Sequence, residues 1–304
     1  MTKSSKPILI SIVGPTAVGK TALAIKLAQW LNTEIVSADS RQFYKEMSIG
    51  TAKPSSEELK AVPHHFIDSH SIDTLYSAGE FGRDATNKIA ELHEKNQFVI
   101  AVGGSGLYLK ALWEGFDEMP SVKPEIRKTL NEELNRDGLD SLLCELKEKD
   151  PEYFDSVDRN NGQRIVRALE VIRETGKPFS SFRIKEKREL PYQNIKIGLN
   201  MDRELLFSRI NERMDIMLDN GLLKEAEELH AYRNHNALQT VGYSEIYGFM
   251  SKEYDFEEAV RLLKRNSRRY AKRQLTWFRK YEDINWFEPD DEEQIKNLIK
   301  KTLL

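Results

Sequence analysis

Short apolar runs alternate with segments of helical periodicity through the first 115 residues of the chain. A continuous apolar run bounded by turn-forming residues is typical of a buried strand, whereas apolar residues three or four positions apart are typical of a helix. The runs predict strands over 7–13, 34–38 and 98–102, and the periodic segments predict helices over 21–31 and 78–95. Strands separated by helices indicate parallel βαβ units with right-handed crossovers.

The pattern becomes helical and charged between about residues 120 and 191. Helices are predicted over 124–135, 141–147 and 162–175, and Gly176 with the proline that follows it ends the last of them. This pattern predicts a helical module that interrupts the α/β pattern.

A strand over 195–199 and a helix over 203–219 restore the α/β pattern, and the remainder to about residue 281 is predicted to be helical. We therefore expect residues 1–119 and 192–304 to form one α/β core, a parallel sheet flanked by helices, with basic helices near its C-terminal end. Residues 120–191 are expected to be an inserted helical domain.

The composition is typical of a soluble globular protein, with 39% hydrophobic and 31% charged residues. No apolar run approaches the roughly 18 residues of a membrane span, and the opening seven residues are too short and polar for a signal peptide. A single cysteine, Cys144, excludes an internal disulfide framework and a cysteine-rich zinc site. We expect a cytoplasmic protein with no membrane partner and an unreactive cysteine.

The motif GPTAVGKT lies between the first predicted strand and the first predicted helix, and matches G-x-x-x-x-G-K-[ST] at every fixed position. Such a phosphate loop surrounds phosphates with backbone N–H groups, and here Lys20 would meet the phosphates while Thr21 would bind Mg²⁺. The loop comprises Gly14, Pro15, Thr16, Ala17, Val18, Gly19, Lys20 and Thr21. It predicts a sheet of the P-loop NTPase type but leaves the reaction open, because kinases, hydrolases and transferases all use this loop.

Two further candidates follow other predicted strands, at the sheet edge where ligands of parallel sheets bind. Asp39 follows the second strand and is either a turn residue, a Mg²⁺ ligand or a general base. The glycine loop 103–106 follows the third strand and is either a tight turn or a second anion-binding site. His64 and His65 have no matching acid or cysteine cluster nearby, which favours a structural role.

The net charge is −3, yet residues 261–280 contain nine Lys or Arg residues and no acid. At 100° per residue, one stripe of this predicted helix is cationic and the opposite face is apolar. The stripe comprises Arg261, Arg265, Arg268, Lys272 and Arg279, and the apolar face comprises Leu263, Tyr270 and Trp277. An uninterrupted cationic ridge favours a polyanionic partner. Gln163, Arg164 and Arg167 near the start of another helix are either a solvated face or a second nucleic-acid contact.

Seven segments together resemble the tRNA dimethylallyltransferase (tRNA isopentenyltransferase) family in its bacterial form, over nearly the whole chain. They are GPTAVGKT (14–21), IVSADSRQFYKEMSIGTAKP (35–54), VPHHFID (62–68), AVGGSGLYLKAL (101–112), NNGQRIVRALEVIRETGKP (160–178), QTVGYSEI (239–246) and RRYAKRQLTWFRK (268–280). The resemblance implies that the phosphate loop holds the diphosphate of dimethylallyl diphosphate rather than ATP. The dimethylallyl group would pass to N6 of adenine 37, in the anticodon stem-loop of tRNA.

The same resemblance implies roles for individual residues. Asp39 would orient the adenine amine and accept its proton, Thr16 would lie near the reacting centre, and Arg213, or else Arg209, would reach the diphosphate. The adenine would be held by Asp39, Ser40, Arg41 and Gln42, after base flipping. The tRNA would be held by Gln163, Arg164, Ile165, Val166 and Arg167, with further contacts from Ser105 and Arg127. Mg²⁺ is the expected cofactor, and the protein is expected to be a monomer.

Three alternatives stay open on the residues alone. The first is a P-loop kinase, which requires ATP turnover; the second is an RNA-binding P-loop protein, in which Asp39 is dispensable. The third is an adenylate isopentenyltransferase that prenylates a free nucleotide. The third leaves the inserted module and residues 163–167 without a role.

Overall fold

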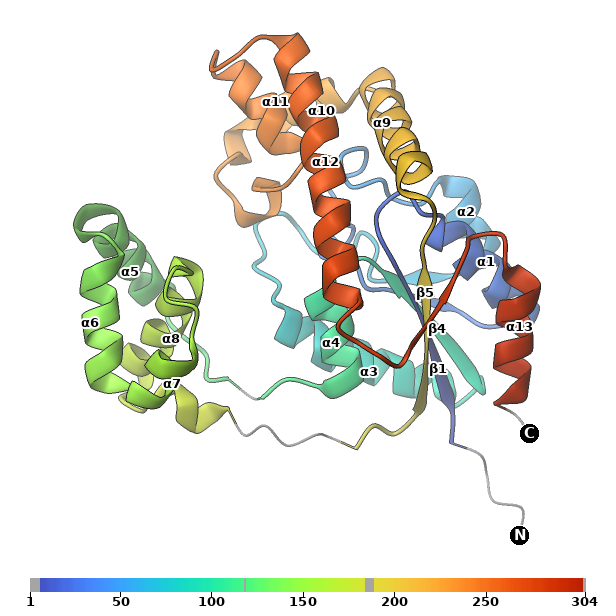
Figure 1. Cartoon of the computed structure of the whole chain (residues 1–304), viewed down its shortest axis with the longest axis horizontal. Coiled ribbons are helices and arrows are strands. Elements are labelled where there is room, and N and C mark those ends of the chain that lie inside the picture. The colour runs from blue at the N-terminus through green and yellow to red at the C-terminus, as the bar shows by residue number, and fades with distance from the viewer. Residues whose placement is uncertain (1–5, 118, 184–188, 303–304) are drawn as a thin grey trace. The chain divides into compact units, whose positions relative to one another are not determined.

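A computed structural model of the chain describes residues 6–117, 119–183 and 189–302 (Figure 1). The chain divides into two compact units, one formed by Met1–Glu114 with Glu189–Leu304 and the other by Gly115–Arg188. The inserted domain was predicted at 120–191, a few residues later at each end. The opening seven residues were predicted not to form a signal peptide. Five of them, residues 1–5, lie outside the described residues.

The first unit is built on a six-stranded sheet in the order β3-β2-β4-β1-β5-β6, and all neighbouring strands are parallel. The strands are β1 (Ile8–Val13), β2 (Ile35–Ser37), β3 (His64–His65), β4 (Phe98–Gly103), β5 (Gln193–Leu199) and β6 (Ile284–Phe287). The predicted α/β fold with a parallel sheet is confirmed. The four predicted strands are present, whereas β3 and β6 were not predicted: both are short strands at the edges of the sheet.

Helices cover both faces of the sheet, which explains why the central strands β1 and β4 are almost wholly apolar rather than alternating. Successive side chains of β1 point to opposite faces. Leu9 and Val13 pack in one core with α3 (Ala78–His93) and α4 (Gly106–Glu114). Ile8, Ile10 and Ile12 pack in the other core with α1 (Lys20–Leu31) and α13 (Glu292–Lys301). The short helix α2 (Ser56–Ala61) precedes β3.

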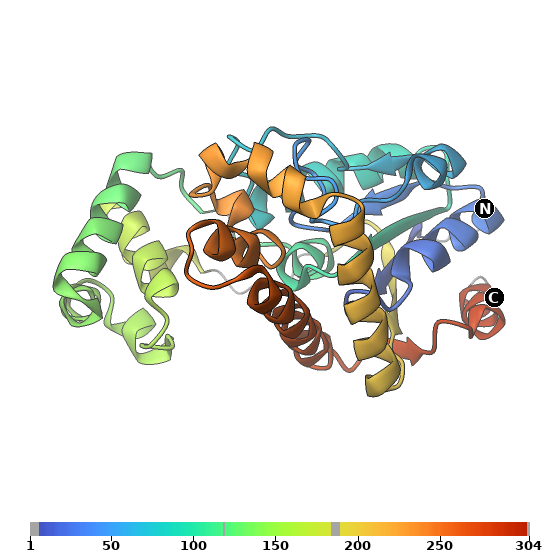
Figure 2. The same cartoon turned by 90° about the horizontal axis from the view of Figure 1, so that it is seen from above.

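The C-terminal part of the same unit is helical, as predicted. It contains α9 (Arg203–Asp219), α10 (Leu222–Glu228), α11 (Tyr243–Met250) and α12 (Phe256–Phe278), with short 3-10 turns at His230–Tyr232 and Asn236–Leu238. Helix α9 begins where the Asp202 side chain accepts hydrogen bonds from the N–H groups of Glu204 and Leu205. Helices α9 and α12 pack side by side, shown in gold and dark orange in Figure 2.

The second unit is a small helical module with its own core. It contains α5 (Pro124–Asp137), α6 (Leu139–Lys149), α7 (Pro151–Ser156), α8 (Gly162–Thr175) and a 3-10 turn at Phe179–Phe182. Helix α8 occupies the predicted residues, because Asn161 caps its first turn and Gly176 ends it in the left-handed conformation. Arg173 ties α8 to α5 and α6 through ion pairs with Glu133 and Glu145.

Candidate active site

The phosphate loop joins β1 to α1 and depends on backbone conformations that glycine allows. Gly14 has φ 146°, and a Cβ there would lie 2.5 Å from the carbonyl oxygen of Leu199. Gly19 has φ 105° immediately before α1 begins at Lys20. The loop therefore delivers the N-terminus of α1, with its unpaired N–H groups, to the carboxyl edge of the sheet, which is a favourable position for an anion.

A cavity of about 520 Å³ opens at this edge, within the first unit. Its walls come from the phosphate loop, from the segments after β2 and β4, and from one face of α9. The lining residues include Thr16, Ala17, Lys20, Thr21, Asp39, Gln42, Gly103, Gly104, Arg209, Arg213, Ile216 and Met217. The structure thus brings together the phosphate loop, Asp39 and the glycine loop, as the sheet topology predicted, and both arginine candidates of α9 line the same cavity.

Positive charge is concentrated at the phosphate-loop end of the cavity. The pKa of Lys20 is lowered to about 7, mainly by desolvation of its ammonium group and also by the nearby charge of Arg213. The negative charge of Asp39 acts in the opposite direction. Desolvation, with a smaller effect of Arg209, also lowers the pKa of Arg213, and Glu58 opposes this shift. A polyanion bound here would relieve the repulsion between these cations.

Asp39 organises the turn after β2 through one carboxylate oxygen. Its Oδ1 accepts hydrogen bonds from the N–H groups of Arg41, at 2.9 Å, and Gln42, at 3.3 Å. The turn interpretation of Asp39 is therefore correct for this oxygen, and the same carboxylate lines the cavity. Oδ2 takes no part in this turn, so the turn and a chemical role are compatible.

Ser105, predicted to contact tRNA, holds the Asp39 turn in place. It is only 9% exposed. Its Oγ accepts a hydrogen bond from the N–H of Ser40, at 2.9 Å, and donates one to Ser40 Oγ, at 3.0 Å. The hydroxyl thereby connects the glycine loop after β4 to the turn after β2.

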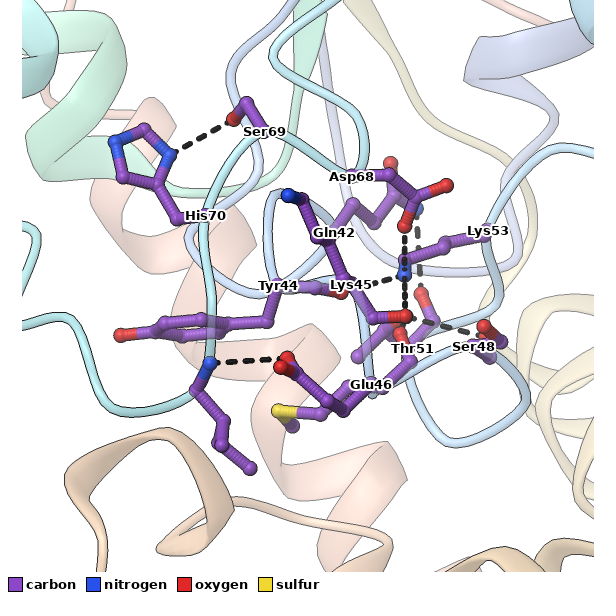
Figure 3. A network of polar contacts seen from close by, with 12 residues as sticks. Gln42, Tyr44, Lys45, Glu46, Ser48, Thr51, Lys53, Asp68, Ser69 and His70 are labelled. Atoms are coloured by element: carbon purple, nitrogen blue, oxygen red, sulfur yellow. Dashed lines mark hydrogen bonds and ion pairs between the residues drawn. The ribbon is translucent and has the colours of Figure 1, made fainter.

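The segment after the Asp39 turn lines the cavity with Gln42, which was predicted as a site residue, and with Thr51, Ala52 and Lys53, which were not. Figure 3 shows the polar contacts of this segment. Gln42 Nε2 donates hydrogen bonds to the carbonyl oxygens of Thr51 and Ala52. Lys53, within the motif GTAKP, donates to the carbonyl oxygen of Tyr44 at 2.5 Å and pairs with Asp68. These contacts fix Gln42 at the cavity edge.

The two histidines lie in β3 and differ in their contacts. His65 Nε2 is 2.7 Å from Glu34 Oε2, an ion pair when the ring is protonated, which supports a structural role. His64 Nδ1 is hydrogen-bonded to the carbonyl oxygen of Val62, and its ring lines the cavity.

The predicted tRNA-binding residues of the second unit fall into two groups. Gln163, Arg164 and Arg127 are exposed, and Arg167 is partly exposed. Ile165 and Val166 instead pack in the core of the module at 0% and 3% exposure. In α8 these two side chains face inward, so the side chains that the predicted tRNA-binding segment 163–167 offers to a partner are those of Gln163, Arg164 and Arg167.

A buried carboxylate positions two of these arginines. Glu170 is 1% exposed, pairs with Arg167 one helical turn earlier, and lies 3.7 Å from Nε of Arg127 on α5. The guanidinium groups of α5 and α8 are thus held on one surface of the module.

The predicted cationic ridge on α12 is only partly correct. Arg261 is paired with Glu258, one turn before the acid-free segment. Arg268 donates a hydrogen bond to Asn211 of α9 at 2.6 Å, and Arg265 is partly buried. Arg279 lies beyond the end of the helix. Packing against α9 therefore covers part of the predicted stripe, although Lys272 of the stripe is exposed. Three cations outside the stripe are exposed as well: Arg269, Arg273 and Lys280.

The chemistry of the cavity suits a magnesium ion held largely by phosphate. Within the described residues, there is no group of three or more His, Cys, Asp or Glu side chains that would form a complete metal site. Mg²⁺ commonly binds through one or two protein oxygens together with substrate phosphates. Among the residues that line the cavity, the Thr21 hydroxyl of the phosphate loop and the Asp39 carboxylate are oxygen groups of this kind.

Comparison with known proteins identifies the family of the chain. Residues 42–281 match the protein family described as IPP transferase. The chain belongs to this family. A protein of Cytophaga hutchinsonii named tRNA dimethylallyltransferase is 54% identical over 295 residues, 97% of each chain. One of the same name from Christiangramia forsetii is 53% identical over 291 residues, 96% of each chain.

Solved structures of two proteins with related names have a similar fold. The tRNA isopentenylpyrophosphate transferase of Bacillus halodurans is similar with a TM-score of 0.73 at 39% identity, covering 98% of this chain and 97% of that one. A eukaryotic dimethylallyltransferase described as acting on tRNA gives 0.76 at 29% identity, covering 95% of this chain and 75% of that one. No helix in the described ranges is both long and apolar enough to cross a membrane.

Proposed function

We propose that this protein transfers the dimethylallyl group of dimethylallyl diphosphate to N6 of adenine 37, beside the anticodon of tRNA. The products are N6-(dimethylallyl)adenosine in the tRNA and free diphosphate. The observation that carries the proposal is that a single cavity contains both the phosphate loop with its cations and the Asp39 carboxylate. Membership of the IPP transferase family and the names of its relatives support the same reaction.

The leaving diphosphate would bind at the cationic end of the cavity. As the bond between the allylic carbon and its oxygen breaks, negative charge develops on the diphosphate. Lys20, Arg213 and the N–H groups at the start of α1 are placed to stabilise that charge. Ile216 and Met217, one helical turn beyond Arg213 on the same face of α9, give the cavity an apolar wall suited to the prenyl chain.

Asp39 would act on the adenine amine. An exocyclic amine is a weak nucleophile, because its lone pair is delocalised into the ring. The nitrogen forms a bond to the allylic carbon as the diphosphate leaves, and its surplus proton passes to the Asp39 carboxylate. The adenine must leave the stacked loop to reach this carboxylate, so the proposal includes base flipping.

The anticodon stem-loop would contact the exposed arginines of the helical module and the exposed cations of α12. Arg164 and Arg167 of α8 and Arg127 of α5 are the contacts that the module offers. Arg269, Lys272 and Arg273 would add a salt-sensitive, sequence-independent share. A free-nucleotide substrate would leave the surfaces of both regions without a partner.

Mg²⁺ is proposed as the cofactor, with Thr21 as its protein ligand, since the hydroxyl lines the cavity beside Lys20. Bound there, the ion would add positive charge next to the diphosphate. We further propose that the protein works as a monomer in the cytoplasm.

A labelled-substrate assay tests the proposal. The protein is incubated with dimethylallyl diphosphate labelled in the prenyl group and with either bulk tRNA or AMP, in parallel with an ATP-turnover assay. Label in tRNA alone is expected. Label in AMP favours the free-nucleotide alternative, ATP turnover without prenyl transfer favours the kinase alternative, and tRNA binding without either favours the RNA-binding alternative.

A further inference from the structure

The side chain of Gln274 on α12 joins the phosphate loop to the glycine loop, two segments that line the cavity. Gln274 is 7% exposed. Its Oε1 accepts a hydrogen bond from the N–H of Thr16 in the phosphate loop at 2.8 Å, and its Nε2 donates one to the carbonyl oxygen of Gly104 at 3.0 Å. One backbone partner is a donor and the other an acceptor, so a single orientation of the amide satisfies both.

Helix α12 packs directly on the glycine loop at this point. A Cβ on Gly104 would lie 2.2 Å from Gln274 Nε2, and a Cβ on Gly106 would lie 2.3 Å from Trp277 Nε1. Two glycines of the loop are therefore explained by the close approach of α12. This favours the tight-turn interpretation of the loop over a second anion site.

The contact extends from the glycine loop to Asp39. Ser105 follows Gly104 and is hydrogen-bonded to Ser40, the neighbour of Asp39. A Cβ on Gly103 would lie 2.2 Å from the carbonyl oxygen of Ala38, so the two segments are also in direct backbone contact. The position of Gly104 therefore influences that of the Asp39 carboxylate, while the other end of the Gln274 amide holds the phosphate loop.

We propose that Gln274 is a positioning residue for prenyl transfer: it fixes the phosphate loop relative to the Asp39 turn. The inference rests on the proposed function for the reaction it serves. Gln274 itself does not line the cavity. Its hydrogen bond occupies the N–H of Thr16, so the diphosphate must be bound by the other N–H groups of the loop and by Lys20. An error of about 1 Å in the placement of reacting groups is enough to reduce a rate about 10²-fold.

Two variants remove this bridge in different ways. Gln274→Met has a similar length and leaves both backbone partners without a hydrogen bond. Gln274→Glu keeps an acceptor for Thr16 but, when ionised, loses the donor to Gly104. Thr276→Ala is the matched control, because Thr276 lies on the exposed side of the same helix and its hydroxyl donates a hydrogen bond to the carbonyl oxygen of Lys272 within that helix.

The experiment measures steady-state prenyl transfer to tRNA, thermal unfolding, and hydrogen exchange of the Thr16 amide in the substrate-free protein. We expect both Gln274 variants to lower kcat at least about ten-fold. Their KM for tRNA should stay within about three-fold of wild type, because α12's exposed cations are retained. Exchange at Thr16 should be faster than in wild type in Gln274→Met, which removes the acceptor of this N–H. It should stay closer to the wild-type rate in Gln274→Glu, which keeps that acceptor, and should be unchanged in Thr276→Ala.

The proposal is overturned if kcat per folded molecule stays at the wild-type value while only the unfolding temperature falls, because Gln274 would then be a structural residue alone. Unchanged Thr16 exchange in Gln274→Met would also overturn it. Absence of transfer by the wild-type protein would count against the proposed function, and binding of inorganic diphosphate would then replace kcat as the readout. Unchanged diphosphate affinity in Gln274→Met would in that case overturn the positioning of the phosphate loop.

Discussion

The ammonium group of Lys20 donates a hydrogen bond to the carbonyl oxygen of Pro15, 2.7 Å away in the loop that precedes it. The lysine is thus folded onto its own phosphate loop, and its pKa is lowered to about 7 by desolvation and by Arg213. A diphosphate offers the ammonium a charged partner in place of a carbonyl oxygen. Binding should therefore raise the pKa of Lys20 and draw a proton onto it.

This relationship predicts a pH dependence of substrate binding. The charged lysine is the form that binds the diphosphate. The contribution of Lys20 to the affinity for dimethylallyl diphosphate should therefore be constant below pH 7. The affinity should fall about ten-fold per pH unit above pH 7, until the pKa of the bound state is reached. Calorimetry at pH 8 in two buffers of different ionisation enthalpy should detect proton uptake.

A Lys20→Arg variant is the control for this effect, because an arginine stays charged throughout this range. Its affinity, though altered in size, should lose the steep fall above pH 7. Affinity of the wild-type protein that is constant from pH 7 to pH 9, without proton uptake, would show that Lys20 is already fully charged in the free protein.

Arg213→Gln should weaken dimethylallyl diphosphate binding at least about ten-fold, because a partly buried cation in a low-dielectric cavity interacts strongly with an anion. Arg209→Gln is the matched control: Arg209 lies one turn earlier on the same cavity face of α9 but is exposed, and its loss should cost less. Arg213→Gln should also move the pH-dependent fall in affinity to higher pH, since Arg213 lowers the pKa of Lys20. A larger effect of Arg209→Gln would reverse the assignment.

Asp39→Asn should reduce the single-turnover rate of prenyl transfer about 10²–10⁴-fold, the typical contribution of a general base. Asparagine can still accept the hydrogen bonds from Arg41 and Gln42 through its Oδ1, so the turn and the affinity for tRNA should be kept within a few-fold. Asp39→Ala removes the turn as well and should lower the unfolding temperature further. Weaker diphosphate binding that extra Mg²⁺ partly restores would instead make Asp39 a metal ligand. A rate near wild type for Asp39→Asn would remove it from the mechanism.

Arg164→Gln should weaken tRNA binding by about 1–3 kcal/mol, the usual contribution of one phosphate or base contact. The side chain is exposed in the helical module, so affinity for dimethylallyl diphosphate and thermal stability should not change. Arg167→Gln is a less clean test, because it also removes a partner of the buried Glu170. Filter binding of tRNA and calorimetry of the prenyl diphosphate measure the two affinities. Equal losses for both substrates would mean that Arg164 supports the fold.

Much of the core could be predicted because its signals are local. The phosphate loop is specified by its own eight residues, and α8 by the cap at Asn161 and the stop at Gly176. The strands β3 and β6 could not be predicted in this way. Their two and four residues gain their strand conformation from pairing with β2 and β5, which are distant in sequence.

The sequence predicted those parts of the site that lie at the carboxyl edge of the sheet, but not the contacts that depend on tertiary packing. Asp39 and the glycine loop 103–106 follow strands, so their approach to the phosphate loop follows from topology. The bridge from Gln274 to Thr16 spans 258 positions in sequence, and only tertiary packing reveals it. Burial of Ile165 and Val166 could have been found from the helical period of α8, which places them opposite its exposed residues Gln163 and Arg164.

The most direct test of the account is to locate the transferred group in the tRNA. The protein is incubated with tRNA and labelled dimethylallyl diphosphate, the tRNA is digested to nucleosides, and the released diphosphate is measured in parallel. We expect label in N6-(dimethylallyl)adenosine, one diphosphate released per group transferred, and no label when adenine 37 is replaced by guanine. Label in AMP but not in tRNA, or transfer that persists without adenine 37, would contradict it.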